Sequence, residues 1–354
     1  MYSADKTAWE VRKTMIYADN AATTRMSRAA IEAMTACLEE EYGNPSSLYT
    51  LGQQAKERLE QARGEIAAVI GAQPGEITIT SGGSEADNQA LRTGAALGRR
   101  AGKTHIISTA FEHHAVLHTL KRLEEEGFSV TLLPVHEDGL VRVEELEAAI
   151  REDTCLVSVM YANNEIGTIQ PIREIGAVCR KHGVLFHTDA VQAVGHVPID
   201  VKAENIDLLS SSAHKFHGPK GIGFLYARKG VRPVNLIEGG AQEGGRRAGT
   251  ENVAAAAAMA AALKETAGGM AETAPRLRAL RDKLIAGLRE IPHSALNGDA
   301  EKRLPGNVNF CFEGIEGGAQ ERGKRAGTEN VPTSPPWRWP WKRRWTSCPR
   351  PCPG

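Results

Sequence analysis

Short apolar segments alternate with longer segments of helical spacing between residues 76 and 187, and this alternation restricts the fold more than any other feature of the sequence. The strand-like segments are residues 76–80, 104–108, 129–134, 155–160 and 184–187, and the helix-like segments between them are residues 85–97, 114–126, 143–150 and 172–182. Strands that alternate with helices form a mainly parallel sheet covered by helices. We therefore expect an α/β fold.

Lys215 lies between two further strand-like segments, residues 206–209 and 222–226, and serine, histidine and glycine flank it. A lysine on such a connection can act as an amine nucleophile and form a Schiff base with a carbonyl group. A solvated lysine in a surface loop is the competing interpretation. This stretch alone does not separate the two.

Asp189 stands at the end of the apolar segment that begins at residue 184. Ligands of open α/β sheets bind beyond the carboxyl ends of the strands. A carboxylate there, one strand away from a Schiff-base lysine, suits pyridoxal phosphate, because it pairs with the pyridine nitrogen and keeps that nitrogen protonated. An aspartate that caps the following helix is the alternative.

Two glycine-containing segments are candidates for binding phosphate. Residues 81–84 connect a strand to a helix, so Gly83 lets the backbone approach an anion and Ser84 adds a hydroxyl. A tight turn with Ser84 as the helix N-cap is the alternative. Residues 239–252 combine glycines with Arg246 and Arg247, which favours a phosphate cradle, with a solvated basic loop as the alternative.

Eight short motifs occur in the order in which cysteine desulfurases carry them. They are residues 17–24, 42–47, 80–85, 112–113, 163–167, 189–192, 214–215 and 247–252. Over roughly residues 15–316 the chain resembles the cysteine desulfurase family, in the class V aminotransferase group and fold type I of the pyridoxal-phosphate enzymes. The resemblance implies a large domain at residues 15–258 with a mainly parallel seven-stranded sheet, and a partial α/β small domain at residues 259–316.

The resemblance also implies roles for individual residues. Lys215 and His113 are the implied catalytic residues, with Lys215 as the cofactor-binding lysine and proton carrier and His113 stacked over the cofactor ring. The implied contacts of pyridoxal 5′-phosphate are Gly83, Ser84, Asn164, Asp189, Gln192, Ser212, His214, Lys215 and Thr250. Thr250 is implied to reach the phosphate in the neighbouring subunit, so the resemblance implies a homodimer.

The implied reaction removes sulfur from L-cysteine, gives L-alanine and leaves a persulfide on the enzyme. The sulfur would serve iron–sulfur cluster or thio-cofactor assembly, with a sulfur-acceptor protein as a partner. Motifs that hold a cofactor do not define the reaction. A different class V lyase or aminotransferase therefore remains an alternative, as does an inactive remnant that only binds pyridoxal phosphate.

The sequence departs from the family pattern after Glu316. Where the family has a mobile loop with the catalytic cysteine, residues 317–331 repeat residues 239–253 with two differences, Arg322 for Gly244 and Lys324 for Arg246. We therefore expect a truncated or chimeric family member that responds to cysteine but transfers little sulfur. For Cys311, upstream of the departure, we expect a structural role.

Residues 332–354 differ in composition from the rest of the chain, with four of the five tryptophans, five Lys and Arg and no acidic residue. The tryptophan codon is TGG, and a shift by one base turns residues 337–342 into a sequence that resembles residues 259–264. We therefore interpret residues 317–354 as a repeated segment whose tail is read out of frame. The spacing of Cys348 and Cys352 is weak evidence for a metal site, and we expect none.

The charge balance is even, with 43 Lys and Arg against 43 Asp and Glu, so it favours neither a nucleic-acid nor an acidic partner. No apolar run reaches the roughly 18 residues of a membrane span, and the N-terminus has no apolar signal core. The six cysteines show no disulfide framework. We expect a cytoplasmic protein, with residues 1–14 as a disordered leader or the result of a misassigned start at Met1 instead of Met15.

Overall fold

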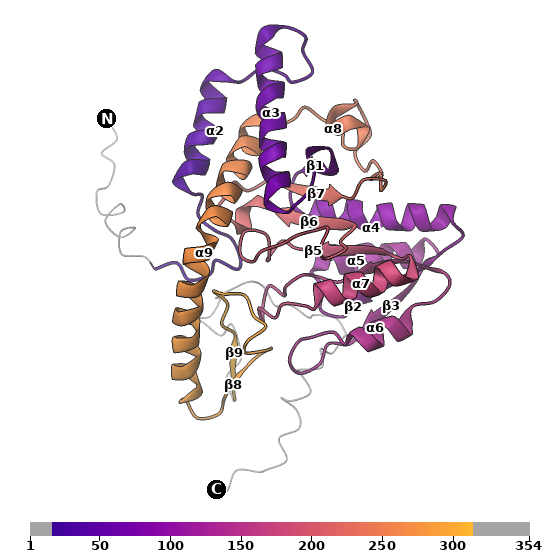
Figure 1. The fold of residues 1–354 in the computed structure, drawn as a ribbon, viewed down its shortest axis with the longest axis vertical. Coiled ribbons are helices and arrows are strands. Elements are labelled where there is room, and N and C mark those ends of the chain that lie inside the picture. The colour runs from indigo at the N-terminus through magenta and orange to yellow at the C-terminus, as the bar shows by residue number, and fades with distance from the viewer. Residues whose placement is uncertain (1–15, 314–354) are drawn as a thin grey trace, which may run out of the picture.

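The computed structural model describes residues 16–313, and its centre is a seven-stranded sheet in the order β1-β7-β6-β5-β4-β2-β3 (Figure 1). The strands are β1 (Ile77–Thr80), β2 (His105–Thr109), β3 (Ser129–Leu133), β4 (Thr154–Ser158), β5 (Leu185–Asp189), β6 (Leu208–Ser212) and β7 (Gly223–Ala227). Strands β2 to β6 pair in parallel, and β7 is antiparallel to both of its neighbours. The expected α/β fold with a mainly parallel seven-stranded sheet is confirmed.

Helices pack against both faces of the sheet. They are α2 (Arg28–Glu40), α3 (Thr50–Val69), α4 (Gly83–Arg100), α5 (His114–Glu125), α6 (Val143–Ala149), α7 (Ile172–His182), α8 (Gln242–Gly245) and α9 (Val253–Arg289). Neighbouring strand residues point to opposite faces. In β2, Ile106 accordingly belongs to the core formed with α4 and α5, and Ile107 belongs to the larger core formed with α3, α6, α7 and α9.

The strand directions bring the candidate residues to one edge of the sheet. Because β7 is antiparallel to both β6 and β1, β1 runs in the same direction as β6. The carboxyl ends of β1, β2, β4, β5 and β6 therefore lie at one edge, where open α/β sheets bind their ligands. The connections at this edge contain the glycine-rich turn, the Glu112-His113 pair, Asn164, Asp189 and Lys215.

Helix α9 runs for 37 residues without a break. Pro275 lies inside this helix and does not end it. Helices α2 and α3 pack along its N-terminal half and strand β8 along its C-terminal part (Figure 1). The boundary expected at residue 258 lies within this helix, and the division into domains stays a prediction.

A two-stranded sheet of β8 (Ser294–Leu296) and β9 (Phe310–Phe312) follows α9. Residues 304–309, before β9, are not part of a strand, and Pro305 and Gly306 form a turn. Among residues 16–313, no helix is both long and apolar enough to span a bilayer. The expected leader, the repeat and the tail lie outside the described residues.

Candidate functional site

Three ionisable side chains meet at the carboxyl edge of the sheet. Asp189 is the last residue of β5, Lys215 ends the short helix η2 (Ala213–Lys215) after β6, and His113 precedes α5. Burial raises the pKa of Asp189, and the charges of His113 and Lys215 lower it. Burial lowers the pKa of Lys215, against the charge of Asp189. The three groups therefore act on one another electrostatically.

The amine of Lys215 is held by the loop that precedes α2. Its Nζ donates to the carbonyl oxygens of Ala21, at 2.5 Å, and Ala22, at 2.9 Å. At the other end of the residue, the ring nitrogen Nε2 of His196 lies 2.9 Å from the carbonyl oxygen of Lys215. Burial lowers the pKa of Lys215. A larger fraction of its amine is therefore neutral than in a solvated lysine, and the neutral amine is the nucleophilic form.

His113 is oriented by the start of α5. Its Nδ1 accepts a hydrogen bond of 3.1 Å from the backbone N–H of Ala115, so the imidazole serves as the N-cap of the helix. Partial desolvation and the neighbouring charges of His114 and Lys215 lower the pKa of His113, while Asp189 raises it. A neutral ring that accepts at Nδ1 carries its proton on Nε2. His113 can therefore stack on a ligand or donate a proton from Nε2.

The N-terminus of α4 presents backbone donors at the same edge. Its N-cap is Gly82, at φ +150°, a backbone conformation that glycine adopts readily and other residues do not. The first intrahelical bond runs from Ala86 N to Gly82 O, so the N–H groups of Gly83 and Ser84 precede it. The alternative interpretation of Ser84 as the N-cap is wrong, because Ser84 is the second residue of the helix.

The helix start is also crowded by neighbouring segments. A Cβ added to Gly83 would come within 2.6 Å of Cγ2 of Val191, and one added to Gly82 would stand 3.6 Å from Oγ of Ser212. The backbone of α4 thus comes close to the ends of β5 and β6 because no side chain intervenes. Unpaired N–H groups at the start of an 18-residue helix form a site for an anion such as phosphate.

His214 and Gln192 both contact the loop at residues 17–24. Nδ1 of His214 lies 3.1 Å from Oγ1 of Thr23, and burial together with nearby lysine charges lowers the pKa of His214 to about 4. The amide Nε2 of Gln192 donates to the carbonyl oxygen of Ala21 at 3.0 Å. Both side chains therefore contact the same loop that holds Lys215.

Thr250 stands apart from this group. It is exposed and makes no hydrogen bond with another candidate residue in the part of the chain that the structure describes. Its loop is fixed to the large sheet by Glu243, which accepts two hydrogen bonds from Arg63, at 2.6 and 3.0 Å, and one from Ile79 N at 2.9 Å. The structure of one chain does not bring Thr250 to Lys215.

A buried polar cluster near Asp189 was missed in the sequence. The ring of His187 lies 2.8 Å from Oγ of Ser158 and 3.0 Å from Oγ of Ser210, and its Nε2 is 3.7 Å from Oδ1 of Asp87. Burial lowers the pKa of His187 to about 3, and burial and the charge of Asp189 raise the pKa of Asp87. Two features of the sequence could have indicated this cluster: His187 lies within an apolar strand, and Asp87 lies on the inward face of a helix.

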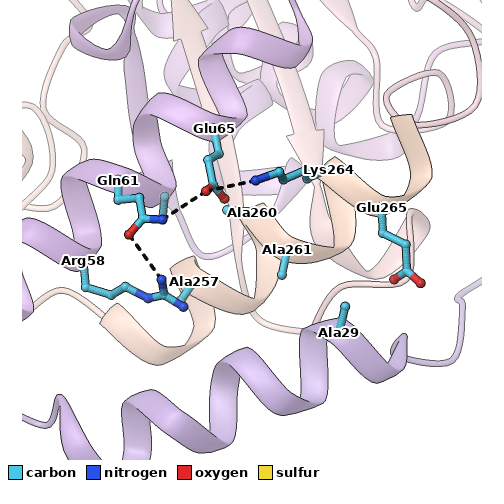
Figure 2. Close-up of a pocket in the computed structure, with 10 residues that line it drawn as sticks. Ala29, Arg58, Gln61, Glu65, Ala257, Ala260, Ala261, Lys264 and Glu265 are labelled. Carbon is cyan, nitrogen blue, oxygen red and sulfur yellow. Dashed lines mark hydrogen bonds and ion pairs between the residues drawn. The ribbon is translucent and has the colours of Figure 1, made fainter. Parts of the chain in front are cut away.

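A hollow of about 350 Å³ between α2, α3 and α9 contains none of the candidate residues (Figure 2). Four of its polar lining residues bond to one another: Gln61 bonds to Arg58 and Glu65, and Glu65 lies 3.6 Å from Nζ of Lys264. The candidate site is therefore defined by the edge of the sheet and not by this hollow.

Comparison with known proteins gives a family for this arrangement. The family described as aminotransferase class-V matches residues 16–322. The cysteine desulfurase IscS of Methanosarcina thermophila is 52% identical over 302 residues, which are 85% of this chain and 74% of that relative. The chain belongs to the cysteine desulfurase family. A second member, IscS of Dictyoglomus turgidum, is 46% identical over 86% of this chain and 77% of its own length.

Solved structures of the family have the same fold. A NifS-like protein superposes with a TM-score of 0.82 at 42% identity and covers 85% of this chain and 83% of its own. A structure described as SspA in complex with cysteine gives a TM-score of 0.76 at 37% identity, with 84% of each chain covered. The cysteine desulfurase family is pyridoxal-phosphate-dependent. The superpositions and the seven-stranded sheet give this chain the fold of these proteins, fold type I.

The residues at the sheet edge fit pyridoxal phosphate. The phosphate needs donors without competing side chains, and the start of α4 offers the N–H groups of Gly83 and Ser84. The pyridine nitrogen needs a carboxylate. Asp189 can provide it, since it is 4% exposed and interacts electrostatically with His113 and Lys215. The aldehyde needs an amine, and Lys215 provides the one described lysine that acts electrostatically on Asp189.

Proposed function

We propose that this chain is a pyridoxal-phosphate-dependent cysteine desulfurase that takes sulfur from L-cysteine and releases L-alanine. The observation that carries the proposal is that Lys215 and Asp189 follow or end neighbouring strands at one edge of the sheet and act electrostatically on each other, beside a helix start with free N–H groups. The family to which the chain belongs supports the same reaction.

In this proposal the cofactor, when bound, withdraws electrons from the bond to be broken. Asp189 would hold the protonated pyridine nitrogen, and the amides of Gly83 and Ser84, with Ser212 and His214, would hold the phosphate. Lys215 Nζ would hold the aldehyde carbon of the cofactor and would move protons at the substrate. The carbonyl oxygens of Ala21 and Ala22, which Nζ contacts, orient the amine.

The remaining candidates complete the pocket. His113 would stack on one face of the ring and would donate from Nε2, because Nδ1 accepts from the start of α5. Asn164 would bind the ring oxygen, and Gln192 would bind another part of the cofactor. We further propose a homodimer in which Thr250 of each chain serves the other site, which would explain why Thr250 is exposed and apart from Lys215.

Exposed apolar side chains support the dimer. Leu38 of α2 is 61% exposed, Tyr42 is 72% exposed and Leu48 is 93% exposed, on a short stretch of chain. Light scattering of the purified protein measures the assembly. A monomer that binds the cofactor at full occupancy would rule out the shared site.

The sulfur acceptor within the chain is a separate question. Cys37, Cys155 and Cys179 are buried, and burial raises the pKa of Cys155 to about 11, so these thiols are poor nucleophiles. Cys311 is the one partly exposed cysteine among residues 16–313, and it lies on β9 with Sγ 3.5 Å from the carbonyl oxygen of Ala295.

We propose a cytoplasmic protein that passes sulfur to an acceptor protein for iron–sulfur cluster assembly.

The first experiment compares the purified chain with Lys215→Ala after both are incubated with pyridoxal phosphate. We expect the wild type to be yellow, with a visible band that borohydride removes, and the variant to lack that band. Addition of L-cysteine should change the wild-type spectrum, and alanine is then quantified together with sulfide and keto acid. Little sulfide is expected from this chain without an external thiol.

Each outcome separates the alternatives. A reducible band in Lys215→Ala would show that another amine binds the cofactor. Keto acid in place of alanine would indicate an aminotransferase, and a spectral change without any product would indicate a binding protein.

A further inference from the structure

Two segments at the carboxyl edge of the sheet are joined by hydrogen bonds that run in both directions. Glu112, in the connection after β2, reaches across so that its Oε1 accepts from the backbone N–H of Met160 at 2.9 Å. Asn163, in the connection after β4, reaches back, and its Nδ2 donates to the carbonyl oxygen of Phe111 at 3.2 Å. Each connection therefore fixes the other.

The same two side chains also order their own segments. Oε1 of Glu112 accepts a hydrogen bond of 2.6 Å from Oγ1 of Thr109, at the end of β2. Oδ1 of Asn163 accepts from the N–H groups of Glu165 and Ile166, at 2.9 and 3.0 Å. An asparagine that accepts from amides two and three residues ahead closes a turn.

The residues that follow these two in the chain are the candidates for the cofactor. His113 follows Glu112, and Asn164 follows Asn163. Glu112 is 4% exposed and Asn163 is 6% exposed, so both are buried while their successors are more open to solvent. A buried, hydrogen-bonded residue next to an open one sets the direction of the backbone at the open position.

The surroundings of Glu112 contain no opposite charge. Among residues 16–313, no lysine, arginine or histidine lies within ion-pair distance of its carboxyl group, and its Oε2 is buried without a hydrogen-bond partner. The charged groups that act on it are two acids, Asp189 of β5 and Asp87 of α4. An isolated buried carboxylate is costly unless it takes up a proton.

The balance of these effects favours the acid form. Burial raises the pKa of Glu112 to about 8, the hydrogen bonds from Thr109 and Met160 act against this rise, and the charge of Asp189 adds to it. Both hydrogen bonds end on the same oxygen, Oε1. A neutral carboxylic acid can accept both bonds through its carbonyl oxygen, and a glutamine amide can do the same.

We propose that Glu112 and Asn163 are positioning residues that hold His113 and Asn164 at the cofactor site, and that Glu112 does so as an uncharged hydrogen-bond acceptor. The proposal rests on the cofactor site proposed above, since His113 and Asn164 are its members. It adds two residues that touch neither cofactor nor substrate and act through the residues that follow them.

The test compares Glu112→Gln and Glu112→Ala with a matched control, Glu76→Ala. Glu76 is also buried, and its carboxylate accepts from two backbone N–H groups, those of Gln73 and Lys229, but it stands beside β1 and β7 and not at the cofactor edge. Each full-length variant is loaded with pyridoxal phosphate. The visible spectrum is then recorded against pH, and cofactor affinity is measured.

Glu112→Gln should keep the wild-type absorption maximum, pH midpoint and affinity. Glu112→Ala should shift the pH midpoint and weaken cofactor binding about tenfold, as expected for the loss of a buried hydrogen bond. Glu76→Ala should lose stability and keep the spectrum. If Glu112→Gln behaves like Glu112→Ala, the residue works through its charge. If Glu112→Ala has the wild-type spectrum and affinity, Glu112 does not position His113 or Asn164.

Hydrogen exchange of the cofactor-free proteins tests the two connections independently of the proposed function. We expect faster exchange in peptides covering residues 160–167 in Glu112→Ala, and wild-type protection in Glu112→Gln. If the alanine variant does not fold, Asn163→Asp, which keeps the acceptor Oδ1 and loses the donor to Phe111, should show faster exchange at residues 109–113. Wild-type exchange in all variants would overturn the proposal, whereas a wild type that binds no cofactor would overturn only the function.

Discussion

Two buried glutamates in this chain have opposite surroundings. Glu243 anchors the glycine- and arginine-rich loop through both oxygens, which accept two bonds from the Arg63 guanidinium and one from Ile79 N. Glu112 joins two connections at the carboxyl edge of the sheet through one oxygen, and among residues 16–313 the charged groups that act on it are the acids Asp189 and Asp87. A buried carboxyl group can therefore hold chain segments together either as a paired ion or as a neutral acceptor, and the two forms respond differently to substitution and pH.

The largest expected effect comes from removing one partner of the Arg63–Glu243 pair. Glu243→Ala leaves the buried Arg63 guanidinium with only one carboxylate partner, the half-exposed Glu60 at 3.2 Å, and should lower the free energy of unfolding by about 3–5 kcal/mol. Urea unfolding followed by circular dichroism measures the change. The double variant Arg63→Met with Glu243→Leu should recover much of the loss, since an apolar pair of similar volume leaves no unpaired charge. A loss below about 1 kcal/mol in the single variant would show that the pair does not bear on stability.

The next effect distinguishes Glu112 by its pH dependence. The folded protein keeps a proton on Glu112 up to about pH 8, whereas an unfolded glutamate releases it near its ordinary pKa of about 4.3. The stabilisation that the protonated Glu112 gives the folded protein is thus complete below about pH 4. It is lost as pH rises toward about 8, when the free energy of unfolding falls by up to about 1.4 kcal/mol per pH unit.

Glu112→Gln removes this titration. The difference in free energy of unfolding between wild type and Glu112→Gln should therefore fall steadily from pH 5 to pH 8, as urea titrations at each pH would show. Asp87 and Asp189 titrate in both proteins, so the part of their titration that does not depend on the charge of Glu112 cancels in the difference. A difference that does not change with pH would mean that Glu112 is ionised in the folded protein.

The smallest expected effect is at an exposed pair. Arg28 and Glu32 of α2 are 2.7 Å apart, with side chains that are 80% and 61% exposed. Glu32→Ala should change the free energy of unfolding by less than about 0.5 kcal/mol, because water screens the charges and the side chains are mobile. The same urea titration provides the measurement. If Glu32→Ala lowers the free energy of unfolding as much as Glu243→Ala does, burial does not determine how much an ion pair stabilises this protein.

The sheet and its order of elements could be predicted because the signals are local. Apolar runs such as β4 and helical spacing such as that of α7 depend on residues close in sequence, and α7 has the expected bounds. The continuity of α9 could not be predicted in the same way. A proline inside a helical pattern usually ends the helix, whereas α9 continues through Pro275.

Some residues of the candidate site could be predicted from local sequence and others could not. Lys215 and Asp189 could be proposed because their chemistry is specific and because each lies at or just after the end of a strand-like segment. Glu112 was part of a motif, but its bonds to Met160 and the reciprocal bond of Asn163 join segments about 50 residues apart. Contacts of this kind depend on the register of neighbouring strands, which no local pattern contains.

The length of α9 has a mechanical consequence. A helix of 37 residues is about 55 Å long, and its residues 253–263 are largely buried in the core, while β8 packs against the other end. Pro275 removes one backbone hydrogen bond and is the natural hinge of this rod. Since about 22 Å of helix lies beyond it, a change of about 10° in the bend would carry the far end by about 4 Å. A small change in the bend at Pro275 would thus move the β8–β9 sheet, which packs near the far end of α9, by several ångströms.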